Sequence, residues 1–172
     1  MNADHSGFRK TLSQFATGVA VITARNADGN LIGMTMSSFN SLSLDPPLIL
    51  FSVDRRALSL SAMLAAKGYA VNVLARQQEH LSNQFAKALG NKWSNVEYEI
   101  GHAQAPLLGG VLAHFECDPY ASHDGGDHVL FIARVVRFRA LEVSDPLVFF
   151  RGKYHSLSTH DTAEPVWPAL YY

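Results

Sequence analysis

Stretches of β-branched and aromatic residues, separated by turn signals, make up most of the chain. Continuous apolar runs at residues 19–23, 48–53 and 69–74 predict buried strands, because β-branched side chains pack well on a pleated surface. Residues 110–120 and 128–138 predict two longer antiparallel strands. Strands therefore dominate the predicted secondary structure.

Turn signals separate these runs. Asp28-Gly29 predicts a hairpin turn before a strand that starts at Leu31, and Asp45-Pro46-Pro47 predicts a turn before residues 48–53. The segment 124–127, with the sequence DGGD, predicts the turn between the two longest strands. The strands are thus joined by short connections.

Helices are expected in three places. Phe8, Leu12 and Phe15 recur at helical spacing, and Gly18 could end that helix. Residues 58–66 predict a short helix, and residues 78–89 predict another.

Many strands with few helices favour a mainly β fold, a closed barrel rather than a doubly wound sheet. A barrel of about six or seven strands is filled by its own side chains. A large ligand is therefore expected on the rim or between subunits.

Composition narrows the function classes. The 172 residues are enough for one compact domain, with a hydrophobic fraction of 48% and a charged fraction of 17%. The formal net charge of -1 and the scattered basic residues argue against nucleic acid or an acidic membrane as the main partner. No apolar run approaches a membrane span, and the polar N-terminal residues do not resemble a signal peptide. Cys117, the only cysteine, fits a reducing cytoplasm and forms no thiolate metal cluster.

Familiar nucleotide and nucleophile motifs are missing. The chain has no G-x-G-x-x-G, no P-loop and no G-x-S-x-G elbow, so a phosphate would have to be bound in another way. Cys117 lies within a predicted strand, where a buried small hydrophobic role is more common than a nucleophilic one. Covalent hydrolytic catalysis is therefore disfavoured.

Three segments are candidates for a site. Residues 33–39 (GMTMSSF) offer hydroxyl and backbone donors suited to the pyrimidine edge and N5 of a flavin, or form a polar edge strand. Residues 52–59 end a strand and lead into a helix, so helix N–H groups and an arginine could bind a ribityl phosphate; the alternative is a capped helix with solvated arginines.

The third segment is residues 123–128 (HDGGDH), the predicted hairpin turn. A metal site is disfavoured, because consecutive ligands on a tight turn rarely converge on one ion. The segment is either a bare turn or one that directs His128 at a ligand, with Asp127 orienting the imidazole ring.

The chain resembles the flavin reductase-like family, which includes reductase components of phenol and 4-hydroxyphenylacetate monooxygenases. Five blocks in order carry the resemblance from about Phe8 to Leu157: FRKTLSQFATGVAVIT, GMTMSSFNSLSLDPPLILFSVDRRALS, YAVNVLARQQEHLSNQFA, GGDHVLFIARV and LVFFRGKYHSL. The resemblance implies an FMN-binding split barrel of Greek-key type with a few peripheral helices, with flavin at the rim and nicotinamide stacked over it. It implies one domain over residues 1–158 and a C-terminal tail over residues 159–172.

The resemblance also assigns residues. Thr35, Met36, Ser37 and Ser38 would lie along the isoalloxazine and ribityl chain, although the family often has alanine and asparagine in place of Met36 and Ser37. The ribityl and phosphate end would contact a second group: Ser52, Val53, Asp54, Arg55 and Ser59. His128, beside Asp127, would face the flavin or nicotinamide as the catalytic residue, and Phe85 and Tyr154 would flank the site or simply pack in the core.

The implied activity is hydride transfer from NADH or NADPH to FMN or FAD, which would supply reduced flavin to a separate monooxygenase. Two alternatives stay open: reduction of a corrinoid or iron complex through bound flavin, and FMN binding or pyridoxamine-phosphate oxidation without reductase activity. A homodimer is expected, because a small barrel leaves its rim open. The aromatic tail with Trp167, Tyr171 and Tyr172 is expected at that interface.

Overall fold

A computed structural model describes residues 4–141 and 145–157. The described part contains three α-helices: α1 (His5–Leu12), α2 (Leu60–Leu64) and α3 (Glu79–Ala86), with 3₁₀ turns η1 (Arg76–Gln78) and η2 (His102–Gln104). Its strands are β1 (Thr17–Gly18), β2 (Ala20–Arg25), β3 (Leu31–Met36), β4 (Asn40–Leu44), β5 (Pro47–Asp54), β6 (Tyr69–Val73), β7 (Tyr98–Ile100), β8 (Pro106–Leu108), β9 (Ala113–Gly125), β10 (His128–Ala140), β11 (Val148–Phe150) and β12 (Lys153–His155). The predicted mainly β class is confirmed.

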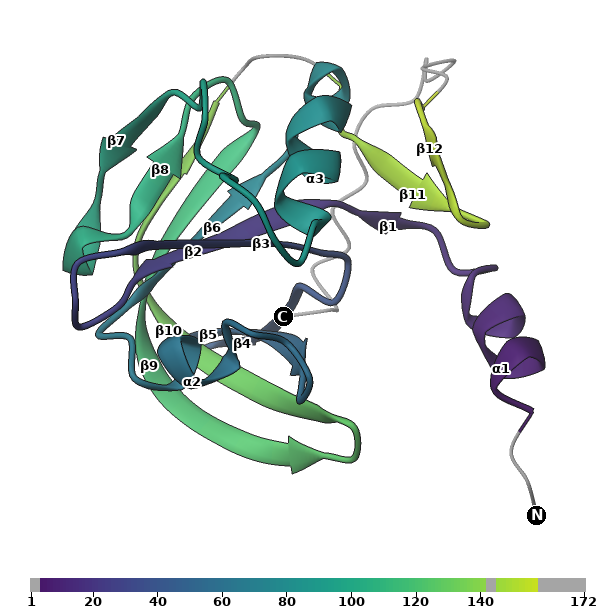
Figure 1. The fold of residues 1–172 in the computed structure, drawn as a ribbon, viewed down its shortest axis with the longest axis horizontal. Coiled ribbons are helices and arrows are strands. Elements are labelled where there is room, and N and C mark those ends of the chain that lie inside the picture. The colour runs from purple at the N-terminus through teal and green to yellow at the C-terminus, as the bar shows by residue number, and fades with distance from the viewer. Residues whose placement is uncertain (1–3, 142–144, 158–172) are drawn as a thin grey trace.

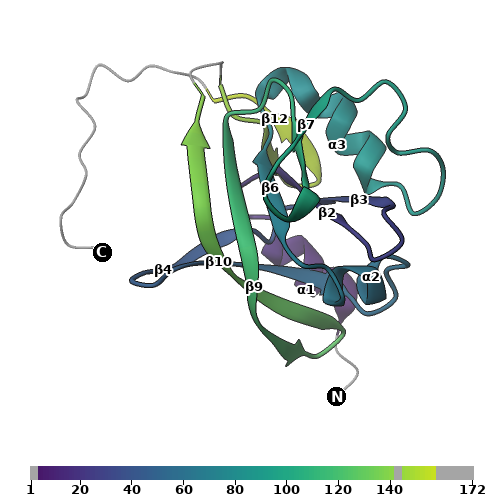
Figure 2. The same cartoon turned by 90° about the vertical axis from the view of Figure 1, so that its left-hand side faces the viewer.

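Seven strands form the principal sheet in the order β3-β2-β6-β9-β10-β5-β4. Its two edge strands, β3 and β4, are joined by residues 37–39 alone. So short a connection spans at most about 14 Å, so the sheet must curl until its edges lie near each other, as Figures 1 and 2 show. Because β3 and β4 are not paired within the described residues, the barrel is split along this line, which we call the seam.

The barrel interior is filled by aromatic and aliphatic side chains. The rings of Phe51 and Phe131 stack at a centroid distance of 5.0 Å, and Tyr69 meets Phe51 edge-on at 5.4 Å. Cys117 is fully buried, and this burial raises the pKa of its thiol to about 12, so the predicted buried hydrophobic role is confirmed. A ligand of flavin size must therefore bind outside this core.

The polar side chains inside the fold bind a two-stranded flap, β7 and β8, to the barrel. Asn72 accepts from the backbone of Leu108 at 2.8 Å and donates to the carbonyl of Val21 at 3.0 Å. Gln78 donates to the carbonyl of Gly109 at 2.7 Å. These bonds satisfy polar groups that would otherwise be costly to bury.

The predicted element boundaries need several corrections. The helix expected over residues 58–66 is only α2, five residues long, and α3 ends at Ala86 rather than near Leu89. Strand β9 starts at Ala113 and extends to Gly125, so the hairpin turn is only Gly126 and Asp127. The greater length of β9 reflects its pairing with β10, which extends the strand beyond its local turn signals.

The N-terminal helix α1 buries none of its residues, although its apolar spacing predicts a packed face. Phe8 is 64% exposed and Leu12 57% exposed, and α1 projects away from the barrel in Figure 1. No helix in the described residues is both long and apolar enough to cross a bilayer. The predicted domain boundary at residue 158 and the tail 159–172 lie outside the described residues.

Candidate functional site

A cavity of about 510 Å³ opens beside the seam, between β3, the segment after β5, and the end of α3. Its lining mixes apolar side chains with cations and hydroxyls: Met34, Thr35, Asp54, Arg56, Ala57, Leu58, Ser59, Phe85, Ala86, Lys87, Ala88 and Lys92. This volume is within the range of small-molecule and cofactor sites. The sequence predicts four of these residues as flavin contacts: Thr35, Asp54, Ser59 and Phe85.

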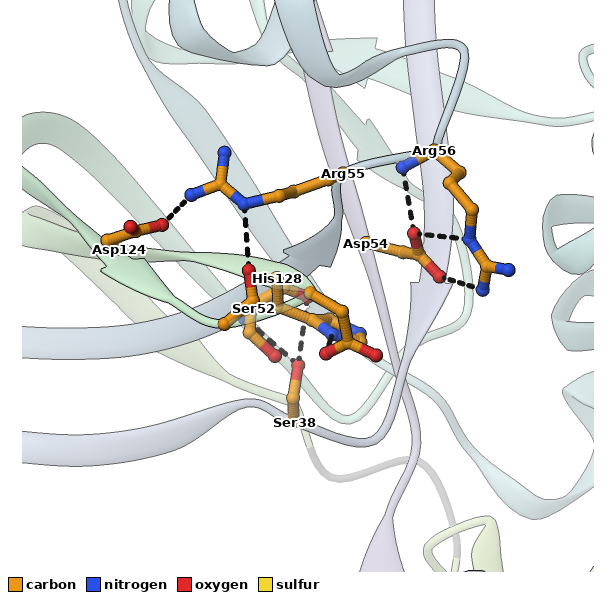
Figure 3. A network of polar contacts seen from close by, with 9 residues as sticks. Ser38, Ser52, Asp54, Arg55, Arg56, Asp124 and His128 are labelled. Atoms are coloured by element: carbon orange, nitrogen blue, oxygen red, sulfur yellow. Dashed lines mark hydrogen bonds and ion pairs between the residues drawn. The ribbon is translucent and has the colours of Figure 1, made fainter. Parts of the chain in front are cut away.

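Side-chain hydroxyls of Thr35 and Ser38 hold the end of β3 and the link that crosses the seam. Thr35 donates its hydroxyl to the carbonyl of Ser82 on α3 at 2.7 Å, which leaves this oxygen only as an acceptor toward a ligand. Ser38 accepts from the backbone N–H of Ser52 at 3.1 Å and donates to the Ser52 carbonyl at 3.3 Å, as Figure 3 shows. The predicted residues Ser38 and Ser52 therefore lie together.

The other two residues of this segment point elsewhere. Met36 is 7% exposed and belongs to the core, so only its backbone is available to a ligand. Ser37 is exposed and lines a different hollow of about 470 Å³, between the seam and α1. Alternation along the chain explains the split, because neighbouring residues of an extended segment point to opposite sides.

After β5 the chain turns around a local ion pair. Arg56 donates from Nη2 and Nε to the carboxylate of Asp54 at 2.7 Å and 3.1 Å, and its backbone N–H donates to Asp54 Oδ1 at 2.8 Å (Figure 3). These hydrogen bonds from Arg56 lower the pKa of Asp54 far below its usual range. Asp54 is therefore a carboxylate at every pH at which the protein would be assayed.

The Arg55 side chain extends away from that of Arg56, toward the β9–β10 hairpin. Its backbone N–H donates to the Asp127 carbonyl at 2.9 Å, its Nε donates to the Gly126 carbonyl at 2.9 Å, and its guanidinium forms an ion pair with Asp124. In Figure 3 the side chains of Arg55 and Arg56 extend to opposite sides of the strand. Arg56 lines the cavity, whereas Arg55 is not among the described residues that line it.

Ser59 is the N-cap residue directly before α2, and its side chain makes no capping hydrogen bond. The hydroxyl is half-buried and lines the cavity. Val53, by contrast, is 1% exposed and packs in the core, so its backbone alone is available.

His128 begins β10 directly opposite Asp54 of β5. A hydrogen bond of 2.7 Å joins its Nδ1 to Asp127 Oδ1, and this bond lowers the pKa of Asp127. The imidazole side chain is 41% exposed, and His128 is not among the described residues that line the cavity. In the described residues, no group of three or more His, Cys, Asp or Glu side chains could hold a metal ion.

Phe85 is part of α3, and Tyr154 of β12 contacts the same helix. Phe85 is 1% exposed; its ring meets Trp93 edge-on at 5.0 Å and also lines the cavity. The Tyr154 hydroxyl lies 2.7 Å from the Ser82 hydroxyl and donates to Asn83 Oδ1 at 3.3 Å. Thr35 and Tyr154 thus bind the same residue of α3, and both help to position the helix.

Sequence reasoning missed two cations of the cavity, Lys87 and Lys92. The Lys92 ammonium donates to the carbonyls of Gly33 at 3.1 Å and Phe85 at 3.0 Å, and burial lowers its pKa. An ammonium has three N–H donors, so one remains for a ligand. Lys92 lies in a segment without helical or strand periodicity, and the neighbouring Trp93 is its only sequence signal of burial.

Comparisons with known proteins agree with one another. A family model described as "Flavin reductase like domain" matches residues 12–158. The reductase subunit HsaB of a flavin-dependent monooxygenase from Rhodococcus jostii is 35% identical over 164 residues, covering 95% of this chain and 84% of that protein. The FMN reductase (NADH) SmoA from Agrobacterium fabrum is 40% identical over 151 residues, covering 88% of this chain and 85% of that protein.

A solved structure is also similar along nearly its whole length. The NADH:FAD oxidoreductase SgcE6 of Streptomyces globisporus, in complex with NAD and FAD fragments, superposes with a TM-score of 0.86 at 31% identity. The match covers 91% of this chain and 94% of that chain.

Proposed function

The chain belongs to the flavin reductase-like family, and we propose that it transfers a hydride from NADH or NADPH to FMN or FAD. The family match over residues 12–158 carries this conclusion. The resemblance read from the sequence blocks is confirmed. The cavity beside the seam is the site that we assign to the flavin.

The residues of the cavity fit a flavin nucleotide. Three cations, Arg56, Lys87 and Lys92, face a space that also holds the Ser59 hydroxyl, and this combination suits a phosphate. Apolar surface from Met34, Phe85 and Leu58 suits an aromatic ring system. When bound there, the flavin supplies a ring that accepts the hydride.

The protein's own contribution is orientation and charge. Backbone groups of residues 35–38, with the bonded pair Ser38 and Ser52, border the rim where the ring edge would lie. His128, oriented by Asp127 through Nδ1, presents Nε2 to the flavin or nicotinamide. A correctly stacked pair of rings needs no nucleophile, because hydride transfer depends mainly on reacting atoms being held about 3 to 3.5 Å apart.

The remaining predicted contacts have indirect roles in this proposal. Met36 and Val53 offer only backbone, and Phe85 and Tyr154 position α3. The assignment of Arg55 to the phosphate requires that its guanidinium leave Asp124 and Gly126; it stays a prediction. Ser37 borders the hollow beside α1 and would meet a ligand only at the outer edge of the rim.

The test is oxidation of NADH or NADPH followed at 340 nm under anaerobic conditions, with and without added flavin. We expect oxidation to stop when bound flavin is stripped and to return when FMN or FAD is restored. Oxidation that continues unchanged in a protein freed of flavin would refute the proposal. His128→Gln should slow hydride transfer while flavin still binds.

We also propose a homodimer. Beyond Arg134, β10 extends past the start of β5 at Pro47, and this half of the strand carries exposed apolar side chains, with Phe138 77% exposed and Val136 39% exposed. Such a surface is typical of subunit contacts. Light scattering should give a dimer; Phe138→Asp should weaken it, whereas Ile100→Asp on β7 should not. A monomeric wild-type protein would contradict this proposal.

Reduced flavin would pass to a separate monooxygenase, because relatives such as HsaB are named as reductase subunits of such enzymes. A cytoplasmic location accords with the supply of NAD(P)H and with a lone buried cysteine that needs no oxidising compartment. Anaerobic transfer of the reduced flavin to candidate oxygenases, with corrinoid and iron complexes as competing acceptors, distinguishes this partner from the alternatives.

A further inference from the structure

Leu108, the last residue of β8, is held to the barrel by both of its backbone groups. Its N–H donates to Asn72 Oδ1 of β6 at 2.8 Å, and its carbonyl lies 2.9 Å from His114 Nε2 of β9. Asn72 and His114 are partners in the register of β6 and β9, so their side chains point to the same face of the sheet. The flap is therefore fastened by one side chain that cannot titrate and one that can.

The bond to Leu108 fixes the tautomer of His114. A carbonyl oxygen only accepts hydrogen bonds, so Nε2 must carry the proton and Nδ1 must be the unprotonated nitrogen of the ring. Within the described residues Nδ1 is buried and has no hydrogen-bond partner, and His114 as a whole is 5% exposed. A second proton would create a buried N–H without an acceptor, which is costly. The closed flap therefore favours the neutral imidazole.

The charged groups around His114 are of both signs. They come from the segment before β7, from β7, from β9 and from β10, and Tyr98 lies among them: Glu97, Glu99, Glu116 and Arg139. Glu116 and Glu99 favour the protonated imidazole, whereas Arg139 opposes it. Burial outweighs the two carboxylates and the bond to Leu108, and it lowers the pKa of His114 below its ordinary value of about 6.5.

This shift decides the direction of the pH effect. Opening of the flap would expose the imidazole to water, where its pKa returns to about 6.5. The open flap then binds a proton that the closed flap excludes. Closure is therefore fully favoured above about pH 7.5 and becomes less favourable as the pH falls below about 6.5.

Two contacts connect the flap to the cavity that we assign to the flavin. The Leu108 side chain is fully buried in the same apolar cluster as Phe85, whose ring lines the cavity. The carbonyl of the next residue, Gly109, accepts from the side-chain amide of Gln78 at 2.7 Å, and Gln78 directly precedes α3. Because α3 carries Phe85, withdrawal of Leu108 would remove packing from one wall of the cavity.

We infer that His114 is a positioning residue for the flavin site: its neutral imidazole holds the flap against the base of α3, and its protonation in mild acid releases the flap and weakens flavin binding. This inference rests on the proposed function, which assigns the cavity to the flavin. His114 lines a separate hollow of about 280 Å³ beneath the flap and is not among the described residues of the flavin cavity, so it acts through Leu108.

The test replaces the imidazole by an amide that does not titrate. His114→Gln keeps an N–H donor close to the position of Nε2, so the bond to Leu108 can form at every pH. His5→Gln, at the exposed start of α1, is the control for the loss of a histidine. The Kd for FMN is measured by flavin fluorescence at about pH 8 and about pH 5.5. Comparison at the same pH cancels the titration of the FMN phosphate and of His128.

At about pH 8 the three proteins should bind FMN within about twofold of one another. At about pH 5.5 the wild type and His5→Gln should bind FMN about three- to tenfold more weakly than His114→Gln. An equal loss of affinity in all three proteins overturns the inference. Flavin-dependent NADH oxidation is followed in the same samples, and its presence leaves the proposed function standing in that case, whereas oxidation without flavin refutes the function itself.

A measurement on the wild type covers the case in which His114→Gln does not fold. Heteronuclear NMR of the imidazole rings should show His114 as the Nε2–H tautomer near neutral pH, and the amide signals of Leu108 and Gly109 should shift with the same midpoint as His114. A His114 that titrates while the Leu108 amide stays unchanged overturns the inference. So does a His114 that stays neutral until the whole protein unfolds in acid.

Discussion

The cavity has two walls that are built in opposite ways. The wall after β5, residues 56–59, is held by contacts with its immediate neighbours in the chain, such as the Asp54–Arg56 ion pair and the bond from the Ala57 N–H to the Asp54 carbonyl at 2.9 Å. Arg55, which is bonded to the hairpin turn, is not part of this wall. The wall after α3, residues 87–95, is held by contacts with distant residues, through Lys92 to Gly33 and through Trp93 to Leu31. We call them the local wall and the anchored wall.

The difference indicates which wall can adapt. Arg56 is largely exposed, and moving it breaks only an ion pair that water can replace. Moving Lys92 or Trp93 would leave buried carbonyls without partners and separate packed rings, and both are costly. The anchored wall should therefore act as the fixed template and the local wall as the part that closes on the ligand.

The largest expected effect is on the packing beneath the anchored wall. A Cβ added at Gly33 would stand 2.4 Å from the Phe85 ring and 3.2 Å from the Trp93 ring, so Gly33→Ala should lower the free energy of unfolding by about 1–3 kcal/mol. Urea denaturation measures it. Gly18→Ala, where nothing lies within 4 Å of the added atom, should change stability by less than about 0.5 kcal/mol. Equal stabilities of the two variants would mean that the wall is not tightly packed.

A second prediction uses the charge of Lys92. Burial lowers the pKa of this ammonium, so it loses its proton at a lower pH than an ordinary lysine, and phosphate binding loses a charged donor with it. FMN affinity should fall by roughly tenfold as pH rises through the alkaline range, while riboflavin affinity changes less. Lys92→Arg, which stays protonated, should remove most of this pH dependence. An identical pH profile in Lys92→Arg would assign the effect to another group.

The two neighbouring arginines test the local wall. Arg56→Ala should weaken FMN binding about three- to tenfold and leave riboflavin unaffected, because Arg56 lines the cavity whereas Arg55 is bonded to the hairpin turn. Isothermal titration of both alanine variants with both ligands measures this. A selective FMN loss in Arg55→Ala alone would instead show that its ion pair with Asp124 opens when flavin binds.

The smallest expected effect is a difference between the two walls in how strongly ligand binding protects their backbone amides from hydrogen exchange. Hydrogen exchange should slow on flavin binding mainly in residues 56–60, since the local wall is the part that becomes ordered by the ligand. Residues 92–96 should change little, because their protection is already set by distant contacts. Stronger slowing in residues 92–96 would reverse the roles of the two walls.

The sequence predicts well whatever depends on neighbouring residues. The β-branched runs become β2, β5 and β6, and the Asp28-Gly29 signal becomes a turn in which Gly29 has a φ of 84°. Family blocks locate Thr35, Asp54, Ser59 and Phe85, which do line one cavity.

What escapes prediction is non-local. Nothing near Lys92 indicates that its ammonium lies against Gly33, because that contact joins segments 59 residues apart. The direction of the Arg55 side chain is likewise decided by the distant hairpin turn, to which it is bonded, and not by its own segment. The exposed apolar face of α1 shows the reverse case, in which the helical spacing is correct but nothing in residues 4–141 and 145–157 covers the face.

The three residues that cross the seam also limit how far apart the edges of the sheet can lie. Because residues 37–39 connect the edges of one curled sheet, the separation of those edges is limited by the reach of the chain, about 14 Å, whatever the side chains are. Substitutions in this region can retune contacts with a ligand but cannot widen the opening. Only an insertion between β3 and β4 could do so, which makes the length of this link, more than its composition, the quantity that limits how far apart the two edges of the split barrel can lie.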